Sequence, residues 1–173
     1  MFLSVKEMEL RKLVFRESYA PSEWEPLDGK LKQASPLVAE GTAELVSRSL
    51  GEVRVRGHLS VRLDAECDRC LEPASIPIES DFDLFYEPMS LVPDEAEVEI
   101  NQGESEIGFY EGEGLELEDI LRERVLLALP MRKVCREDCQ GICPICGQNR
   151  NQKSCGCETR VLDNRWAALK RLK

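Results

Sequence analysis

The most regular pattern in the sequence is an alternation of apolar and polar residues between Val53 and Cys67. Apolar or small side chains occupy the odd positions, and charged or polar ones occupy the even positions. A period of two predicts a strand with one buried face, as antiparallel sheets commonly contain. Gly57 interrupts the row of apolar side chains, so we expect a bulge or a bend there.

A second alternating run extends from Ala74 to Tyr86, with its apolar residues on even positions. Together the two runs predict a hairpin whose connection contains a C-x-x-C motif, Cys67 to Cys70. Other segments show shorter strand-like patterns or loop composition. The predicted strands are residues 8–15, 37–46, 97–100 and 107–110, and the predicted loops are residues 21–36 and an acidic segment over about 88–114.

Helical periodicity appears only in the last third of the chain. Apolar residues from Leu117 to Ala128 repeat at intervals of three and four, and Pro130 marks the end of this helix. A second helix is predicted over residues 162–172, capped by Asp163. The order of elements predicts an α+β fold: an antiparallel β-sheet or partly open barrel, followed by a helix, a cysteine-rich zinc segment and a C-terminal helix.

We therefore expect two parts: an antiparallel β-domain over residues 1–114, and a helical, zinc-binding region over residues 115–173 that packs on it. A chain of 173 residues is long enough for one domain with a small appendage. No apolar run approaches the roughly 18 residues of a membrane span. Charges among the first ten residues argue against a secretory signal. We expect a cytoplasmic protein with no membrane partner.

The net charge of −10 argues, as an average, against a nucleic-acid partner. The charge is unevenly distributed, however. Residues 72–121 contain 16 acidic and no basic side chains, whereas residues 122–173 contain 12 basic and five acidic ones. Because a partner meets the local field, the basic end leaves RNA open as a partner. The acidic segment is expected to be a solvated face with a flexible loop; alternatively, it repels wrong partners or binds a basic protein surface.

All eight cysteines fall into two groups along the chain. The first is Cys67 and Cys70; the second is Cys135, Cys139, Cys143, Cys146, Cys155 and Cys157. In a reducing compartment four disulfides are not expected, and close spacings between thiols are typical of metal ligands. Zinc takes four thiolates at tetrahedral corners. The eight cysteines therefore predict two four-cysteine zinc sites.

The spacing leaves the division of the cysteines open. In the arrangement that we favour, the last four cysteines hold one ion and the first four hold the other, because the local site then closes a short loop. In a second arrangement the two C-x-x-C pairs share one ion. A third has one zinc ion and four free thiols.

Other chemistries of cysteine fit the sequence less well. Redox catalysis at a C-x-x-C needs a helix N-terminus, whereas Cys67 is expected between two strands. Iron–sulfur clusters also use such cysteines, but the C-P-x-C-G run at residues 143–147 is typical of a zinc or single-iron knuckle. Catalytic zinc keeps an open position and often uses histidine. The only histidine, His58, falls on the polar phase of its strand, so we expect it to face solvent and expect no enzymatic activity.

Basic residues surround the second cysteine group and are candidates for RNA binding: Arg132, Lys133, Arg136, Arg150, Lys153, Arg160 and Arg165. A zinc module with exposed Arg and Lys is suited to phosphate contacts. The alternative is that these cations keep the module soluble and offset the thiolate charge. No aromatic platform for single-stranded RNA is visible, since Trp166 falls on the apolar face of its predicted helix.

The cysteine-rich half of the chain resembles the bacterial YceD family, described as the large ribosomal RNA subunit accumulation proteins. The matching runs are C-D-R-C at residues 67–70, L-A-L-P at 127–130, D-C-Q-G-I-C-P-I-C-G at 138–147, Asn149, Asn151, C-x-C at 155–157 and D-N-R-W-A-A-L at 163–169. Departures occur at Gln140, Arg150 and Asn164, none of them an expected metal ligand.

The resemblance implies a cytoplasmic factor for the accumulation or processing of large-subunit ribosomal RNA, with no established enzymatic activity. We expect it to act by binding ribosomal RNA or a large-subunit precursor. The alternatives are a zinc-stabilised protein–protein adaptor that does not contact RNA, and a nuclease or other metalloenzyme. The last lacks a visible group of carboxylates beside an open metal site.

Overall fold

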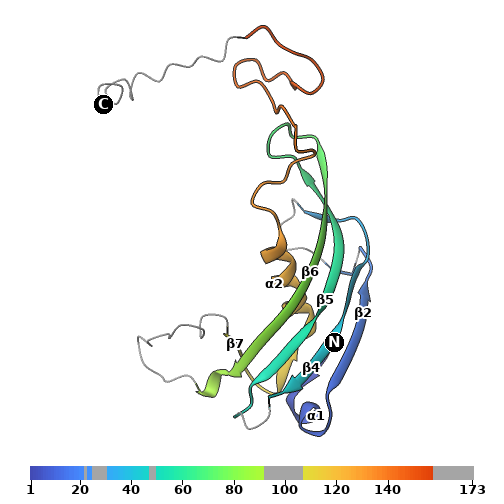
Figure 1. The fold of residues 1–173 in the computed structure, drawn as a ribbon, viewed down its shortest axis with the longest axis vertical. Coiled ribbons are helices and arrows are strands. Elements are labelled where there is room, and N and C mark those ends of the chain that lie inside the picture. Colours follow the sequence, from blue (N-terminus) through green and yellow to red (C-terminus); the bar gives the residue numbers. More distant parts are fainter. Residues whose placement is uncertain (22, 25–30, 47–49, 92–106, 158–173) are drawn as a thin grey trace, which may run out of the picture. The chain divides into compact units, whose positions relative to one another are not determined.

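The computed structural model of the chain describes five stretches: residues 1–21, 23–24, 31–46, 50–91 and 107–157 (Figure 1). The chain divides into two compact units. The first contains Met1–Ala65 and Ser75–Met131, and the second contains Glu66–Ala74 and the residues from Arg132 onward. Most of the sheet and both described α-helices lie in the first unit, and all eight cysteines lie in the second.

The main sheet is mixed. Its strands follow the order β2-β4-β5-β6-β7, with β3 paired to β5. Strand β4 is antiparallel to both β2 and β5, whereas β6 and β7 run parallel. The strands are β2 (Leu13–Tyr19), β3 (Lys32–Gln33), β4 (Leu37–Leu45), β5 (Val53–Glu66), β6 (Pro73–Pro88) and β7 (Ile107–Tyr110).

The fold is α+β, but the expectation of a wholly antiparallel sheet is wrong at β7. The connection between β6 and β7 is long enough for the crossover that a parallel pair needs. It begins with a short 3₁₀ turn, Met89–Leu91. The predicted strand over residues 107–110 is β7, while the predicted piece at 97–100 lies outside the described residues.

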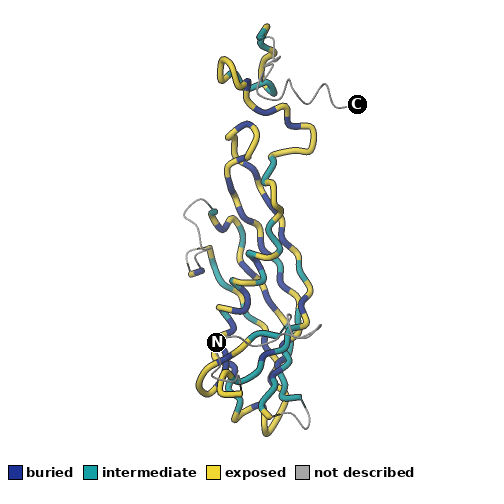
Figure 2. The backbone as a smooth tube through the Cα atoms, turned by 90° about the vertical axis from the view of Figure 1, so that its left-hand side faces the viewer, coloured by how far each residue is buried: buried dark blue, intermediate teal, exposed yellow. Residues whose placement is uncertain are grey.

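The two long alternating runs form the strands that the period of two predicts. In β5 the odd residues from Val53 to Ala65 are buried except Gly57, and in β6 the even residues from Ala74 to Ile78 are buried. Figure 2 shows this alternation of buried and exposed positions along the tube. The strand predicted over residues 37–46 is β4.

The strand predicted over residues 8–15 is wrong in its first half. A short helix, α1 (Val5–Leu10), occupies this stretch, and β2 begins only at Leu13. Met8 is buried on the helix while Leu10 is 87% exposed, so the two apolar residues do not share an inward face. Upstream, β1 (Phe2–Ser4) pairs antiparallel with β8 (Gly114–Glu116) in a separate two-stranded sheet.

Helix α2 (Leu117–Ala128) is the helix that the periodicity predicted, and it ends at Leu129, just before Pro130. Its apolar face joins the main core through Leu117, Ile120, Leu121 and Val125. The compact units place α2 with the sheet, whereas the sequence-based division at residue 114 grouped it with the cysteines. The helix predicted over residues 162–172 lies outside the described residues.

Of the bulge or bend expected at Gly57, the structure excludes the bulge: the pairing of β4 and β5 continues through this residue, which lies directly opposite Gly41. A Cβ atom on Gly57 would lie 3.0 Å from the Gly41 Cα and 3.0 Å from the Phe82 ring. A Cβ atom on Gly41 would meet the Phe15 ring at 2.6 Å. The two glycines therefore leave space in which the buried rings of Phe15 and Phe82 cover the backbone of the central strands.

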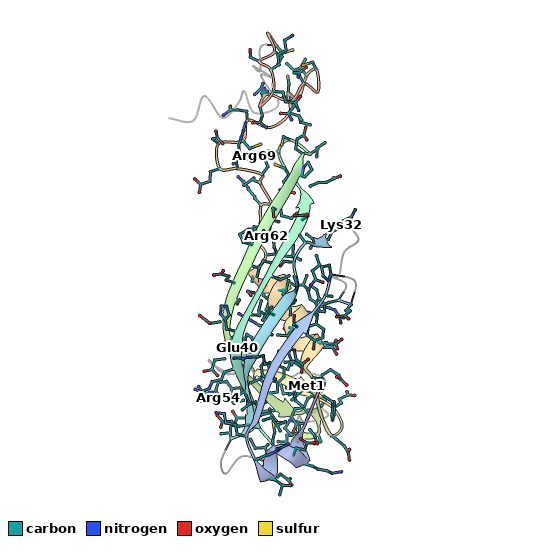
Figure 3. All side chains as sticks on the ribbon, turned by 90° about the vertical axis from the view of Figure 1, so that its right-hand side faces the viewer. Met1, Lys32, Glu40, Arg54, Arg62 and Arg69 are labelled. Atoms are coloured by element: carbon teal, nitrogen blue, oxygen red, sulfur yellow. The ribbon has the colours of Figure 1, made fainter. Side chains whose placement is uncertain are left out.

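The outer face of the sheet is lined by charged side chains that pair across neighbouring strands. Arg16 on β2 binds Glu40 on β4 at 2.9 Å, and Arg54 on β5 binds Asp83 on β6. His58 lies on this face, as expected, with its Nδ1 2.8 Å from an Asp81 carboxylate oxygen. Figure 3 labels Glu40, Arg54 and Arg62 on these strands. Among the described helices, none is long and apolar enough to cross a membrane.

We predict that Gly41→Ala lowers the free energy of unfolding of the first unit by about 1 to 3 kcal/mol, the usual cost of overpacking. The added methyl group must displace either the Phe15 ring or the backbone of β5. Urea unfolding followed by circular dichroism measures the change. Thr42→Ala on the same strand is the control and should cost well under 1 kcal/mol. Equal effects of the two substitutions would contradict the close packing around Gly41.

Candidate metal centres

The structure gathers the eight cysteine sulfur atoms into two clusters of four, both in the second unit. The first centre consists of Cys67, Cys70, Cys135 and Cys139, and the second centre consists of Cys143, Cys146, Cys155 and Cys157. Within each centre the sulfur atoms all lie within 4.8 Å of one another. Of the arrangements that the sequence left open, the structure contains the one in which the last four cysteines cluster together.

The sulfur spacing in the first centre fits four ligands around one tetrahedral ion. A zinc–sulfur bond of about 2.3 Å places tetrahedral ligands about 3.8 Å apart. The Cys67 and Cys139 sulfur atoms are 3.9 Å apart, and those of Cys70 and Cys135 are 3.6 Å apart. Four thiolates suit a borderline or soft metal such as zinc or iron and disfavour magnesium or calcium. The residues present therefore fit a metal ion at this position.

Each centre begins with a C-x-x-C turn, and the two turns have the same backbone hydrogen bonds. In each, the residue after the second cysteine donates its N–H to the carbonyl oxygen of the first cysteine. The first cysteine in turn donates its N–H to the residue five positions later. The pairs, all at 2.8 to 2.9 Å, are Leu71 to Cys67, Cys67 to Glu72, Gly147 to Cys143 and Cys143 to Gln148.

The residue after each C-x-x-C turn has a left-handed backbone. Gly147 has φ 72°, which glycine adopts freely, and Leu71 has φ 62°. The left-handed conformation costs an L-residue about 1–2 kcal/mol. The Leu71 side chain is 61% exposed, so it gains little from burial in return. The first turn therefore keeps the shape of the second at the expense of local strain.

Two residues inside the first C-x-x-C turn hold it against the segment that carries Cys135 and Cys139. Asp68 donates its N–H to the Lys133 carbonyl oxygen (2.7 Å) and accepts the Lys133 N–H on its carboxylate (2.6 Å). Arg69 donates from Nη1 to the Cys139 carbonyl oxygen (3.0 Å). The sequence analysis missed these roles. Charged residues in the two variable positions of the turn indicate that polar partners exist, but they do not show which segment supplies those partners.

The two centres differ in burial. In the first centre Cys67, Cys70 and Cys139 are buried, together with Ala74, and only Cys135 is exposed. In the second centre only Cys143 is buried; Cys146 is exposed, and Cys155 and Cys157 are half-buried. Solvent and metal ions therefore have easier access to the sulfur atoms of the second centre than to those of the first.

The thiols within each centre do not titrate alike. Burial raises the pKa of Cys67, but backbone N–H groups of Cys135, Arg69 and Cys70 outweigh it and lower the pKa to about 6. Backbone N–H groups of Cys146 and Ile145 lower the pKa of Cys143, also to about 6. One thiol in each centre is therefore ready to bind a metal ion at neutral pH.

Other thiols hold their protons more strongly. Although Cys135 as a residue is exposed, desolvation of its sulfur, followed by hydrogen bonding to Cys70, raises its pKa to about 12. Hydrogen bonding to Cys146, followed by burial, raises the pKa of Cys157 to about 12. Because four thiolates cannot share so small a space without a cation, a metal ion has to displace protons when it binds.

The predicted RNA-binding cations are placed differently from one another. Lys133 lies 3.6 Å from the Asp68 carboxylate, and Arg136 lies 3.2 Å from Asp138. Arg150 donates to the Cys143 sulfur at 4.0 Å. Within the described residues, Arg132 and Lys153 are exposed and have no acidic partner. Arg160 and Arg165 lie outside the described residues, so their role stays a prediction.

We predict that zinc affinity rises with pH by at least tenfold per pH unit at each centre between pH 6.5 and 8, because zinc displaces one or more thiol protons. Below about pH 6 the slope should steepen, since Cys67 and Cys143 then also bind a proton in the metal-free protein. Competition with a chromophoric chelator at several pH values measures the slope. An affinity independent of pH would contradict binding by these thiols.

We predict opposite effects for matched substitutions after the two turns. Gly147→Ala should lower the stability of the metal-loaded protein by about 1–2 kcal/mol, because alanine resists the left-handed backbone. Leu71→Gly should leave stability unchanged or raise it by up to about 1 kcal/mol, because it removes the same strain. Chemical unfolding of both variants in excess zinc measures the changes. A loss in Leu71→Gly as large as that in Gly147→Ala would show that the backbone conformation is not what limits these turns.

Comparison with known proteins finds relatives that match part of the chain. Three uncharacterized proteins, one from Mycobacterium bovis and two from Mycobacterium tuberculosis strains, are each 33% identical to it over 117 residues. The match covers 68% of this chain and 54% of each relative, so the chain spans about half the length of the curated relatives it matches. No solved structure matches the chain.

The family comparison covers both cysteine centres and the long hairpin that carries Cys67 and Cys70. Residues 55–173 match the family described as the large ribosomal RNA subunit accumulation protein YceD. This match extends over more than half of the chain and includes all eight cysteines. The chain therefore belongs to the YceD family of large ribosomal RNA subunit accumulation proteins.

Proposed function

We propose that the protein is a cytoplasmic, zinc-binding ribosome-biogenesis factor that supports the accumulation or processing of large-subunit ribosomal RNA by binding rather than by catalysis. The description of its family names the accumulation of the large ribosomal RNA subunit, which supports the ribosomal part of the proposal. The observation that carries the proposal further is the pair of four-cysteine centres within one small unit. Both consist of cysteine alone, the donor set of structural zinc sites, which keep no position open for a substrate.

In this proposal, zinc bound at both centres stabilises the fold of the second unit. Apart from cysteines, the small apolar cluster around the first centre contains only Ala74, with Val134 packed against it. Such a cluster is too small to hold a unit of this size together by burial alone. Zinc bound to four thiolates supplies the missing folding free energy. Four thiolates also bind zinc in preference to the harder cations of the cytoplasm.

RNA contact would depend on individual exposed cations and not on a uniformly basic surface. The described part of the second unit contains six basic and five acidic residues. Each zinc ion with four thiolates contributes a further charge of about −2. Its exposed cations without acidic partners are Arg69, Arg132 and Lys153. Arg69 already donates to the carbonyl oxygens of Glu137 and Cys139. Arg132 and Lys153 are therefore the positions that we propose to meet phosphates. The sequence after residue 157 adds five basic and two acidic residues.

A protein–protein adaptor is the second candidate, and exposed apolar side chains around the cysteines favour it. Leu71 is 61% exposed, Ile145 is 55% exposed and Ile142 is 40% exposed, all within the second unit. Side chains of this kind at the edge of a metal-stabilised turn are suited to a partner protein rather than to a phosphate backbone. The acidic residues at 72–121 would then offer a complementary surface for a basic ribosomal protein.

We predict that the double variant Arg132→Glu/Lys153→Glu loses binding to large-subunit ribosomal RNA by tenfold or more, because it replaces two phosphate contacts with repulsions. Fluorescence anisotropy with labelled fragments of that RNA at physiological salt measures the loss. Arg62→Glu is the matched control, an exposed arginine on the sheet that should leave binding unchanged. Zinc content of each variant is measured in parallel to verify that the second unit is intact.

The two candidate functions give different outcomes in the same experiment. If the wild-type protein binds neither ribosomal RNA nor large-subunit precursor particles, the RNA proposal fails. The adaptor function holds instead if three results are found together. The wild-type protein binds the precursor particles, Arg132→Glu/Lys153→Glu leaves this binding unchanged, and Ile145→Ser abolishes it.

A further inference from the structure

We propose that the two metal centres fill cooperatively, and that Asn151 is the positioning residue that couples them. The inference rests on the proposed binding of metal at both centres and goes beyond it, because two four-cysteine sites on one chain could equally fill independently. The elements that connect the centres all belong to the second unit. They centre on residues 148–151, which we call the linking segment.

The linking segment is attached to the second centre at two points. The Gln148 carbonyl oxygen accepts the backbone N–H of Cys143 at 2.9 Å, which closes the C-x-x-C turn. The Arg150 side chain donates from Nη2 to the Cys143 sulfur at 4.0 Å. A metal ion that fixes Cys143 and Cys146 therefore also fixes the backbone at the start of the linking segment.

The same segment reaches the first centre through the Asn151 side chain. Its Nδ2 donates to the Cys139 sulfur at 3.3 Å, and its Oδ1 accepts the backbone N–H of Gln140 at 2.8 Å. Asn151 is itself held by a bond from its N–H to the Asn149 Oδ1 at 2.9 Å. The amide is thus oriented at both of its polar atoms, with its donor aimed at a ligand sulfur of the first centre.

A short antiparallel pairing supports this link. Ile142 forms a bridge with Asn149, and the Arg150 N–H donates to the Gly141 carbonyl oxygen at 2.9 Å. From this pairing the Ile142 N–H reaches the Arg69 carbonyl oxygen, also at 2.9 Å, inside the turn of the first centre. Gly141 has φ 71°, and a Cβ there would lie 2.9 Å from that carbonyl oxygen, so only glycine fits between the two.

These contacts make each centre a condition for the geometry of the other. When the second centre binds a metal ion, the linking segment is ordered and the Asn151 amide is placed against Cys139. A hydrogen bond to a thiolate is a charge-assisted one, so it stabilises the ligand form of Cys139. When the first centre binds a metal ion, the fixed Cys139 in turn holds Asn151 and orders the backbone that carries Cys143. Coupling of this kind is reciprocal by thermodynamic necessity.

The test is intact-mass spectrometry under native conditions on the reduced, metal-free wild-type chain, mixed with one equivalent of zinc. Independent sites of equal affinity leave half of the molecules with a single zinc ion. A coupling factor of about tenfold or more, within the usual range, lowers that fraction to about a quarter or less, with metal-free and two-zinc species in the majority. We expect the second distribution.

Three variants assign the coupling to Asn151. Asn151→Ala should raise the fraction with one zinc ion toward that of independent sites, because the donor to Cys139 is lost. Asn151→Asp should do the same while keeping an oxygen for the Gln140 N–H, since its carboxylate repels the thiolate. Ser154→Ala is the control; this residue of the second unit is exposed and lies outside the linking segment, its side chain forms no hydrogen bond within the described residues, and the variant should behave as wild type.

Each outcome decides a separate point. A wild-type population in which half or more of the molecules carry one zinc ion, and in which Asn151→Ala does not raise that fraction further, overturns the cooperativity. Cooperative filling that Asn151→Ala and Asn151→Asp leave unchanged overturns the role of Asn151. A wild-type chain that binds no zinc at all overturns the metal-binding proposal itself, which makes the failure of the proposed function distinguishable from failure of the coupling.

Discussion

Cys67 and Cys139 stand 72 positions apart in the sequence, yet their sulfur atoms meet at 3.9 Å, and the second unit depends on this closure. The loop between them contains β6, β7, β8 and α2, so the first centre closes a loop that includes the whole second stretch of the first unit, Ser75–Met131. A loop of that length is entropically costly to close, although the cost grows only slowly with length. The few apolar side chains near the cysteines cannot offset this entropic cost, whereas four sulfur–metal bonds can.

The second unit is organised by backbone hydrogen bonds around sulfur, whereas the first is organised by side-chain packing. In the sheet, Gly41 and Gly57 face each other and leave space that the rings of Phe15 and Phe82 fill. The packing of the central strands is thus set by where glycine and aromatic residues stand in the sequence. Around the cysteines, the same pair of N–H to carbonyl bonds recurs in both turns although the residues differ. At Leu71 the hydrogen bonds of the turn outweigh the backbone preference of the residue, because leucine adopts a left-handed conformation there.

The sequence was sufficient for those features that follow from local periodicity. Strands β4, β5 and β6, helix α2 and the surface position of His58 were all predicted, since each depends on which face is buried. The parallel pairing of β7 and the short helix α1 were not, because both depend on how distant segments pack. The spacing of the cysteines allowed several ways of dividing them between two sites. Only the fold shows that Cys135 and Cys139 cluster with Cys67 and Cys70. The roles of Asp68, Arg69 and Asn151 depend on contacts across the fold, which no local pattern contains.

The long separation between the ligands of the first centre also sets the order in which the chain acquires its parts during synthesis. The hairpin turn with Cys67 and Cys70 leaves the ribosome well before Cys139, by roughly 4 to 14 seconds at usual elongation rates. During that interval the two thiols have no completed site to enter. Until the rest of the cysteines emerge, the two thiols of the nascent hairpin are open to oxidation and to metal ions held with other ligands.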